Sequence, residues 1–139
     1  MLDYLIDEKI KIILRNAEIE KTELKHPYVG TEHLLLSFLK IGNDKIKKIL
    51  NNYGLSYDLF KSILIKYIGI GSIDSNVILY TPLLRNVISD SFRYSNDNII
   101  DETSLFFSFY YSEEGIAKSL LKIISIEFSP LIYACLIIE

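Results

Sequence analysis

The fold is decided by the stretch Val29-Gly30-Thr31-Glu32-His33-Leu34-Leu35-Leu36-Ser37-Phe38-Leu39. Thr31 is predicted to be a helix N-cap, because its hydroxyl can accept a hydrogen bond from a free N–H in the first turn. Glu32 then lies in that turn, where the helix dipole favours a carboxylate. The rest is apolar apart from His33 and Ser37, and a helix that is apolar on most sides is a buried one. We therefore expect the central helix of a helical domain, entered by a short polar loop.

The same pattern recurs in degraded form 71 residues further on, in Ile100-Asp101-Glu102-Thr103-Ser104-Leu105-Phe106-Phe107-Ser108-Phe109-Tyr110. At this offset Leu34 aligns with Leu105 and Ser37 with Ser108. The alignment continues without a gap until Leu64 meets Cys135. A period near 70 in a chain of 139 residues indicates two copies of one structural unit.

The spacing of apolar residues predicts four helices in each copy. In the first copy they are expected at about 3–24, 32–41, 44–53 and 56–67, with glycines after the second and third. Gly69–Asn76 combines glycines with short polar residues, which favours a linker. In the second copy Thr81-Pro82 and Ser129-Pro130 each open a helix with a cap and a proline. The other two are expected at about 102–111 and 114–124, and Phe92 is expected to face the core.

The predicted fold class is all-α, with eight helices as two four-helix repeats related by a pseudo-twofold axis. Repeat 1 covers about residues 3–68, the linker 69–79 and repeat 2 about 80–139, together forming a single domain over 1–139. Period-two alternation is absent, so no strand is expected. A unit of about 65 residues is marginal alone. Packing between the copies should therefore stabilise the fold and leave a groove at the seam.

Composition limits the class of function. The chain is 50% hydrophobic and 24% charged, so a core can form. Its net charge of −3, with scattered lysines, argues against nucleic acid as a partner. Acidic residues interrupt the amino-terminal apolar stretch, which argues against a secretory signal. The longest apolar run, Leu131 to Ile138, is too short for a membrane span of roughly 20 residues.

These features predict a protein that is not secreted and binds neither nucleic acid nor membrane. The expected location is the cytoplasm or an organelle matrix. The frequent isoleucine, lysine, asparagine and tyrosine are typical of an AT-rich coding sequence, as in some organelles and endosymbionts, and a plastid is the expected organelle.

The sequence shows no recognisable catalytic site. Cys135 lies in an apolar run and reads as a buried hydrophobic residue. His26 and His33, seven residues apart without a nearby cysteine, make a poor zinc site, and His33 is expected to be a hydrogen-bonded core residue. No glycine-rich run leads into a Lys-Ser or Lys-Thr pair, so the chain lacks a phosphate-binding loop. We expect no catalytic residue, metal or cofactor in this segment, and a binding role instead.

Six residues are candidates for binding a protein or peptide. Glu32 is open to two interpretations, a ligand contact or a partner of the helix dipole. Five aromatic residues in the six positions 106–111 cannot all face one core, so Tyr110 and Tyr111 are expected to reach the surface. The complete set is Tyr28, Thr31, Glu32, Thr81, Tyr110 and Tyr111.

Three motifs carry a resemblance to a known family. Gly30-Thr31-Glu32-His33-Leu34-Leu35 resembles the "GTEH-L-L" signature of the Clp amino-terminal repeat. Glu114-Gly115-Ile116-Ala117-Lys118 resembles the "EGIA-K" start of that repeat's third helix, and Tyr80-Thr81-Pro82 resembles the opening of its second copy. The resemblance covers essentially the whole chain and is closest to the N-domains of ClpC-type Hsp100 unfoldases, a double Clp-N motif.

The resemblance implies a chaperone role in protein quality control. In that family the domain precedes two AAA+ ATPase modules and recruits substrates and adaptors, usually before degradation by the ClpP peptidase. The implied partners are unfolded or tagged proteins, adaptor proteins and, through the rest of the chain, a ClpP-type peptidase. ATP and magnesium are then expected in the full-length protein. A free-standing Clp-repeat protein that docks on a Clp ring and a small helical enzyme remain as alternatives.

Phosphoarginine binding is also implied for some ClpC N-domains, through the signature glutamate and a threonine that begins the first helix of each copy. Here the first copy keeps Glu32 but has Asp7 at the threonine position. The second copy keeps Thr81 but has Thr103 at the glutamate position. Neither site is therefore complete, and an aspartate would in addition repel the phosphate. Weak or no phosphoarginine binding is expected.

Overall fold

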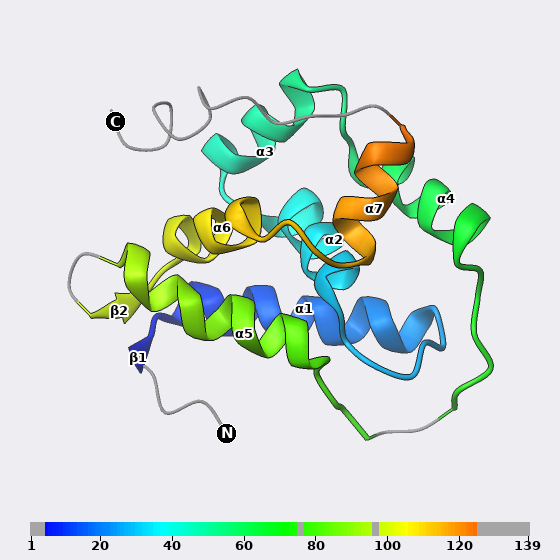
Figure 1. Ribbon diagram of the computed structural model, residues 1–139, viewed down its shortest axis with the longest axis horizontal. Coiled ribbons are helices and arrows are strands. Elements are labelled where there is room, and N and C mark those ends of the chain that lie inside the picture. Colours follow the sequence, from blue (N-terminus) through cyan, green and yellow to red (C-terminus); the bar gives the residue numbers. More distant parts are fainter. Residues whose placement is uncertain (1–4, 75–76, 96–97, 125–139) are drawn as a thin grey trace.

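The computed structural model of the chain describes residues 5–74, 77–95 and 98–124. These residues form a mainly helical domain in which α2 lies centrally and α1 and α5 run across one side (Figure 1). The elements in chain order are β1 (Leu5–Ile6), α1 (Glu8–Glu23), α2 (Thr31–Ile41), α3 (Asp44–Asn52), α4 (Tyr57–Tyr67), α5 (Pro82–Asp90), η1 (Ser91–Tyr94, a 3₁₀ helix), β2 (Ile99–Ile100), α6 (Glu102–Tyr111) and α7 (Ile116–Ile123).

Most predicted helices are present close to their expected bounds. Ser56 and Thr81 cap α4 and α5 as expected, each accepting a hydrogen bond from the backbone N–H three residues later. The helix predicted after Ser129-Pro130 lies outside the described residues, so the count of eight stays a prediction. Across the described ranges, no helix is both long enough and apolar enough to cross a membrane.

The predicted start of the first helix is wrong. Residues 3–6 were expected to be helical, but Leu5–Ile6 form a strand and α1 begins at Glu8. Asp7 stops the helix there, because its carboxylate accepts a hydrogen bond from the Ile10 N–H at 2.9 Å and so caps α1.

Short strands connect the two copies, which corrects the expectation of none. Leu5–Ile6 pair in parallel with Ile99–Ile100, and Val29 forms an isolated parallel bridge with Tyr80. Each pairing joins the segment before the first helix of one copy to the segment before the second helix of the other. Strands of two residues carry too little alternation to be seen in a sequence.

The same side-chain contact occurs once in each copy. Ser37 in α2 donates a hydrogen bond to the Ile13 carbonyl of α1 at 2.6 Å, and Ser108 in α6 donates to the Val87 carbonyl of α5 at 2.5 Å. The paired residues are 24 apart in the first case and 21 in the second. This difference of three residues agrees with the sequence. The loop between the first and second helices is about three residues shorter in the second copy than in the first.

Aromatic side chains join the cores of the two copies. Phe38 of α2 is fully buried and meets Phe106 edge-on at 5.3 Å between ring centroids and Phe109 at 6.4 Å. Such aromatic pairs add stability beyond their buried area.

Phe92, expected to face the core, is instead 36% exposed, because the chain tightens into the 3₁₀ helix η1 at Ser91.

A glycine allows α7 to pack closely on α2. Gly115 has a φ of 106°, a left-handed conformation that disfavours residues with a Cβ. A Cβ at this position would also lie 2.7 Å from Thr31 Oγ1 and 2.7 Å from Leu83 Cδ2. The glycine of the "EGIA-K" motif therefore serves both the turn and the packing between copies.

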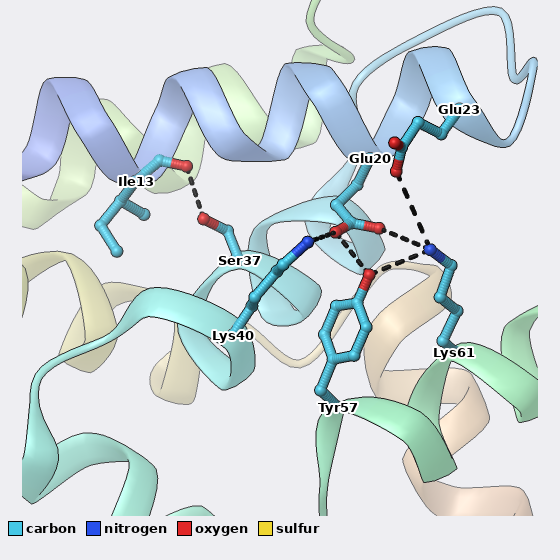
Figure 2. Close-up of polar contacts among 7 residues, drawn as sticks. All are labelled: Ile13, Glu20, Glu23, Ser37, Lys40, Tyr57 and Lys61. Carbon is cyan, nitrogen blue, oxygen red and sulfur yellow. Dashed lines mark hydrogen bonds and ion pairs between the residues drawn. The ribbon is translucent and has the colours of Figure 1, made fainter.

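A buried carboxylate of α1 contacts polar side chains of both α2 and α4. Glu20 of α1 is fully buried and accepts a hydrogen bond from the Tyr57 hydroxyl at 2.6 Å (Figure 2). Lys61 Nζ lies 3.0 Å from the Tyr57 hydroxyl and 3.3 Å from Glu20, while Lys40 Nζ lies 3.9 Å from Glu20. Burial, followed by the hydrogen bond to Glu20, raises the pKa of Tyr57. The phenol therefore stays a donor at neutral pH.

Replacing Tyr57 by phenylalanine is expected to lower the free energy of unfolding by about 1.5–3 kcal/mol, because the buried Glu20 carboxylate loses a donor. Urea denaturation at neutral pH measures this loss. Tyr67→Phe is the matched control, since Tyr67 is 47% exposed at the end of the same helix and should change stability by less than about 0.5 kcal/mol. Equal losses in the two variants would contradict a role for the Glu20 contact.

Candidate binding site

The Val29–Tyr80 bridge brings the starts of α2 and α5 together. The Val29 N–H donates to the Leu79 carbonyl at 2.8 Å, and the Thr81 N–H donates to the Val29 carbonyl at 2.9 Å. The loop before α2 and the segment before α5 therefore lie side by side. The two helix N-termini come from different copies.

A surface hollow of about 330 Å³ lies at this junction and contains two of the predicted residues, Tyr28 and Thr81. Tyr28 is 51% exposed, and Ile78 and Leu79 add exposed apolar surface. Arg85 supplies a positive charge. The full lining is Tyr28, Ile78, Leu79, Tyr80, Thr81, Pro82 and Arg85. Such a surface suits an apolar side chain with a nearby carboxylate.

Thr81 has a structural task at this site. Its hydroxyl oxygen accepts a hydrogen bond from the Leu84 N–H at 3.1 Å, and Pro82 follows as the first helical residue. The hydroxyl keeps its own hydrogen to donate. Thr81 can therefore contact a ligand without releasing the start of α5.

Glu32 is buried and folds back over Gly30. It is 6% exposed, and a Cβ added at Gly30 would lie 2.2 Å from Glu32 Oε1. Burial raises the pKa of Glu32, and a hydrogen bond from its own backbone N–H opposes that shift. This placement favours Glu32 as a partner of the helix start rather than as a ligand contact.

Thr31 is not the N-cap that the sequence predicts. Gly30 occupies the cap position, and Thr31 is the first helical residue, 3% exposed beneath Gly115. The ring of His33 takes over the capping, since its Nδ1 accepts a hydrogen bond from the Gly30 N–H at 2.9 Å. Histidine at this third position was not recognised as a cap from the sequence.

Two buried histidines form a hydrogen-bonded relay. Because His33 Nδ1 accepts from Gly30, the hydrogen of the neutral ring lies on Nε2 and is donated to His26 Nδ1 at 2.9 Å. His26 Nε2 then donates to the Gly69 carbonyl at 2.8 Å. The relay ties the start of α2 to the start of the linker. The expectation that His33 is a hydrogen-bonded core residue is confirmed.

These histidines also belong to the group that most resembles a metal site among residues 5–74, 77–95 and 98–124. Ligand atoms of His26, Glu32 and His33 lie within 4.8 Å of one another. To bind a metal through Nε2, however, neutral His33 would carry its hydrogen on Nδ1, facing the Gly30 N–H at 2.9 Å. The Nδ1–H of His33 and the N–H of Gly30, both donors, would then face each other. The hydrogen bonds favour a structural role over metal binding.

The two remaining candidates, Tyr110 and Tyr111, lie at the end of α6 and do not line the Tyr28–Thr81 hollow. Tyr111 is 47% exposed and stacks on Tyr94 at 5.6 Å, whereas Tyr110 is partly buried. Lys118 Nζ donates to the Tyr110 carbonyl at 2.7 Å, and burial lowers the pKa of Lys118 to about 8. The expected exposure is thus found for Tyr111 and only partly for Tyr110.

Arg85, Ile78 and Leu79 line the hollow but were not among the candidates predicted from the sequence. Val77 to Tyr80 is an uninterrupted apolar run before a helix cap, which was the available signal. The run was treated as linker because nothing in it indicates which segment it pairs with.

Comparisons with known proteins agree with this architecture. The family model described as "Clp repeat (R) N-terminal domain" matches residues 5–124. ATP-dependent Clp protease ATP-binding subunit ClpC from Staphylococcus aureus (strain USA300) is 28% identical over 120 residues, which cover 84% of this chain. A Chlamydia pneumoniae protein named "Probable ATP-dependent Clp protease ATP-binding subunit" is 26% identical over 127 residues, or 86% of this chain.

One solved structure supports the fold. The N-domain of ClpV from Vibrio cholerae superposes with a TM-score of 0.60 at 17% identity, covering 93% of this chain and 74% of that one. The two curated relatives are much longer, since the match covers 15% of the length of each.

Proposed function

Since this chain belongs to the family of Clp repeat N-terminal domains, as the match over residues 5–124 shows, we propose that it recruits clients and adaptors for a ClpC-type ATP-dependent unfoldase. The domain performs no chemistry in this proposal. It holds a client or adaptor weakly and so raises its local concentration at an ATPase pore, with a gain set by the connecting linker. A ClpP-type peptidase, ATP and magnesium belong to the rest of such a protein.

The family match carries this proposal, and the surface around Tyr28 and Thr81 is consistent with it. That surface combines exposed apolar side chains with one positive charge. The proposal places initial contact there, with unfolded or tagged segments as the ligands. Tyr111, on α6, is a second contact surface, suited to an adaptor because its exposed ring is large and apolar.

The test compares the protein encoded by the complete gene with a form that lacks residues 1–124. ATP-driven unfolding of an adaptor-delivered client and of an adaptor-free client is measured for both proteins. We expect the deletion to slow the adaptor-delivered reaction strongly. If the full protein and the deleted form unfold each client at the same rate, recruitment by this domain is contradicted.

A free-standing accessory protein that docks on a Clp ring is the second candidate. The coding sequence beyond Glu139 separates the two. A downstream phosphate-binding loop supports the unfoldase, and a stop codon supports the accessory protein.

Phosphoarginine is expected to bind weakly or not at all, because the Glu32 carboxylate is buried against Gly30 and the helix start at Asp7 carries a negative charge. Isothermal titration of the domain with free phosphoarginine measures this. Arginine serves as the control ligand. Saturable binding with micromolar affinity would show the expectation to be wrong.

A further inference from the structure

The segment Ile78–Tyr80 presents an unused backbone edge. Its bridge to Val29 uses the Leu79 carbonyl and the Thr81 N–H. In an extended chain, successive residues direct their N–H and C=O groups to opposite edges. Those of Ile78 and Tyr80 therefore point away from Val29, and no backbone hydrogen bond to either residue is found in the described part of the chain. Such an edge is a template for another strand.

A groove runs between this edge and the outer face of α1. It consists of two hollows, of about 320 Å³ and 300 Å³. Tyr80 lines the first and Ile78 the second, and both hollows share Arg15 and Glu18. Because the hollows share these residues, they form one continuous surface, which we call the α1 groove.

The α1 groove offers apolar contacts on either side of a charge. Ile12 and Ile19 are 54% and 47% exposed, and their spacing of seven residues places them on one face of α1, about 10.5 Å apart. Arg15 lies between them. Exposed large aliphatic side chains that line a hollow indicate a surface that another molecule covers.

Most charged side chains that line the α1 groove already have partners: Lys11 pairs with Glu8 at 3.0 Å, and Glu23 lies 4.0 Å from Lys61. Glu18 accepts a hydrogen bond from the Tyr80 hydroxyl at 2.5 Å, so that carboxylate already has a partner. For Arg15, by contrast, the described ranges hold no carboxylate within ion-pair distance. A ligand that fits this surface carries a carboxylate near its middle or end, because a guanidinium pairs well with it.

We propose that an extended client segment binds in the α1 groove as an added strand along Ile78–Tyr80. Its backbone pairs with the free edge, its apolar side chains lie over Ile12 and Ile19, and one aspartate or glutamate contacts Arg15. This mode of strand addition gives affinity through the main chain and selectivity through alternate side chains. The inference rests on the proposed function and specifies which client segments the domain selects.

The experiment uses a fluorescein-labelled octapeptide that alternates valine and serine and carries one aspartate. Fluorescence polarisation measures its binding to the domain. Two N-methylated versions are compared, one blocked at the odd-numbered amides and one at the even-numbered amides. Only one edge of an added strand pairs with the domain. We therefore expect one version to bind at least tenfold more weakly and the other to change less than twofold. Equal binding by the two versions would overturn strand addition.

Two variants of the domain locate the site. Ile19→Ser is expected to weaken peptide binding at least fivefold, whereas Ile68→Ser, which removes an equally exposed isoleucine (48%) at the end of α4, should leave it unchanged. Arg15→Gln should weaken binding of the aspartate peptide but not of its asparagine counterpart. Equal effects of Ile19→Ser and Ile68→Ser, or of Arg15→Gln on both peptides, would overturn the assignment.

The peptide-binding experiment and the deletion experiment can fail independently of each other. If deletion of residues 1–124 slows client unfolding while the octapeptide does not bind, recruitment stands and the α1 groove is not the client site. If the peptide binds with the expected edge preference while the deletion has no effect, the groove is confirmed and the recruiting role fails.

Discussion

Replacing Phe38 by alanine is expected to lower the free energy of unfolding by about 3–5 kcal/mol. Phe38 is fully buried, and its ring is the contact through which α2 meets Phe106 and Phe109 of the second copy. Alanine leaves a cavity at the point where the two cores join. Since domains are stable by only about 5–15 kcal/mol, this single change removes a large part of the stability.

Urea denaturation followed by circular dichroism measures the effect. Phe92→Ala is the matched control, because Phe92 is 36% exposed and its removal should cost less than about 1 kcal/mol. If the two copies were independent, Phe38→Ala would produce two separate transitions. A single cooperative transition at lower urea is the expected result, and two transitions would contradict a shared core.

Acidification from pH 7 to pH 5 is expected to lower the free energy of unfolding by about 2 kcal/mol through His33 alone. Burial, followed by the charges of His26 and Lys21, lowers the pKa of His33 from 6.5 to about 3. Between these values the unfolded chain binds a proton that the folded chain does not. Stability is therefore lost as the pH falls below 6.5, by about 1.4 kcal/mol for each unit.

Two buried carboxylates have the opposite effect on the pH dependence of stability. Burial raises the pKa values of Glu32 and Glu102, so each contributes stability below its ordinary value of 4.5 and loses it as the pH rises through the folded value. The contribution of His33 to the pH dependence of stability is therefore obtained from the difference between the natural protein and a variant without this histidine. Urea denaturation at pH 7, 6 and 5 is compared between the natural protein and His33→Gln, which does not titrate. The variant should be less stable at pH 7 but lose less stability on acidification, and parallel curves would contradict the assignment to His33.

The helices could be predicted from sequence because local signals determine them. The bounds of α6 agree with the expectation, and the caps Ser56 and Thr81 were identified from the hydroxyl alone. Repetition at 71 residues also predicted equivalent positions, as the hydrogen bonds of Ser37 and Ser108 illustrate. Caps and apolar periodicity both act within a few residues, which is the range that a single sequence reveals.

Pairings over long distances could not be predicted. The bridge between Val29 and Tyr80 is set by how the copies pack, and neither residue carries a strand signal of its own. For the same reason Glu32 was open to two interpretations. Its burial against Gly30 depends on the loop conformation that the bridge and the His33 cap impose. The hollow beside the bridge is lined by Tyr28 and Thr81, which were candidates from the sequence, and by Ile78, Leu79 and Arg85, which were not. That either group binds a ligand stays a prediction.

The pairing of Leu5 with Ile99 has a consequence for biosynthesis. A ribosome releases the amino terminus first, so Leu5–Ile6 stay without their partner until more than ninety further residues have been translated. This strand pair can therefore form only after Ile100 has left the exit tunnel, when the first copy and the start of the second have been made. Premature termination before Ile99 would yield a fragment in which Leu5–Ile6 lack their partner strand.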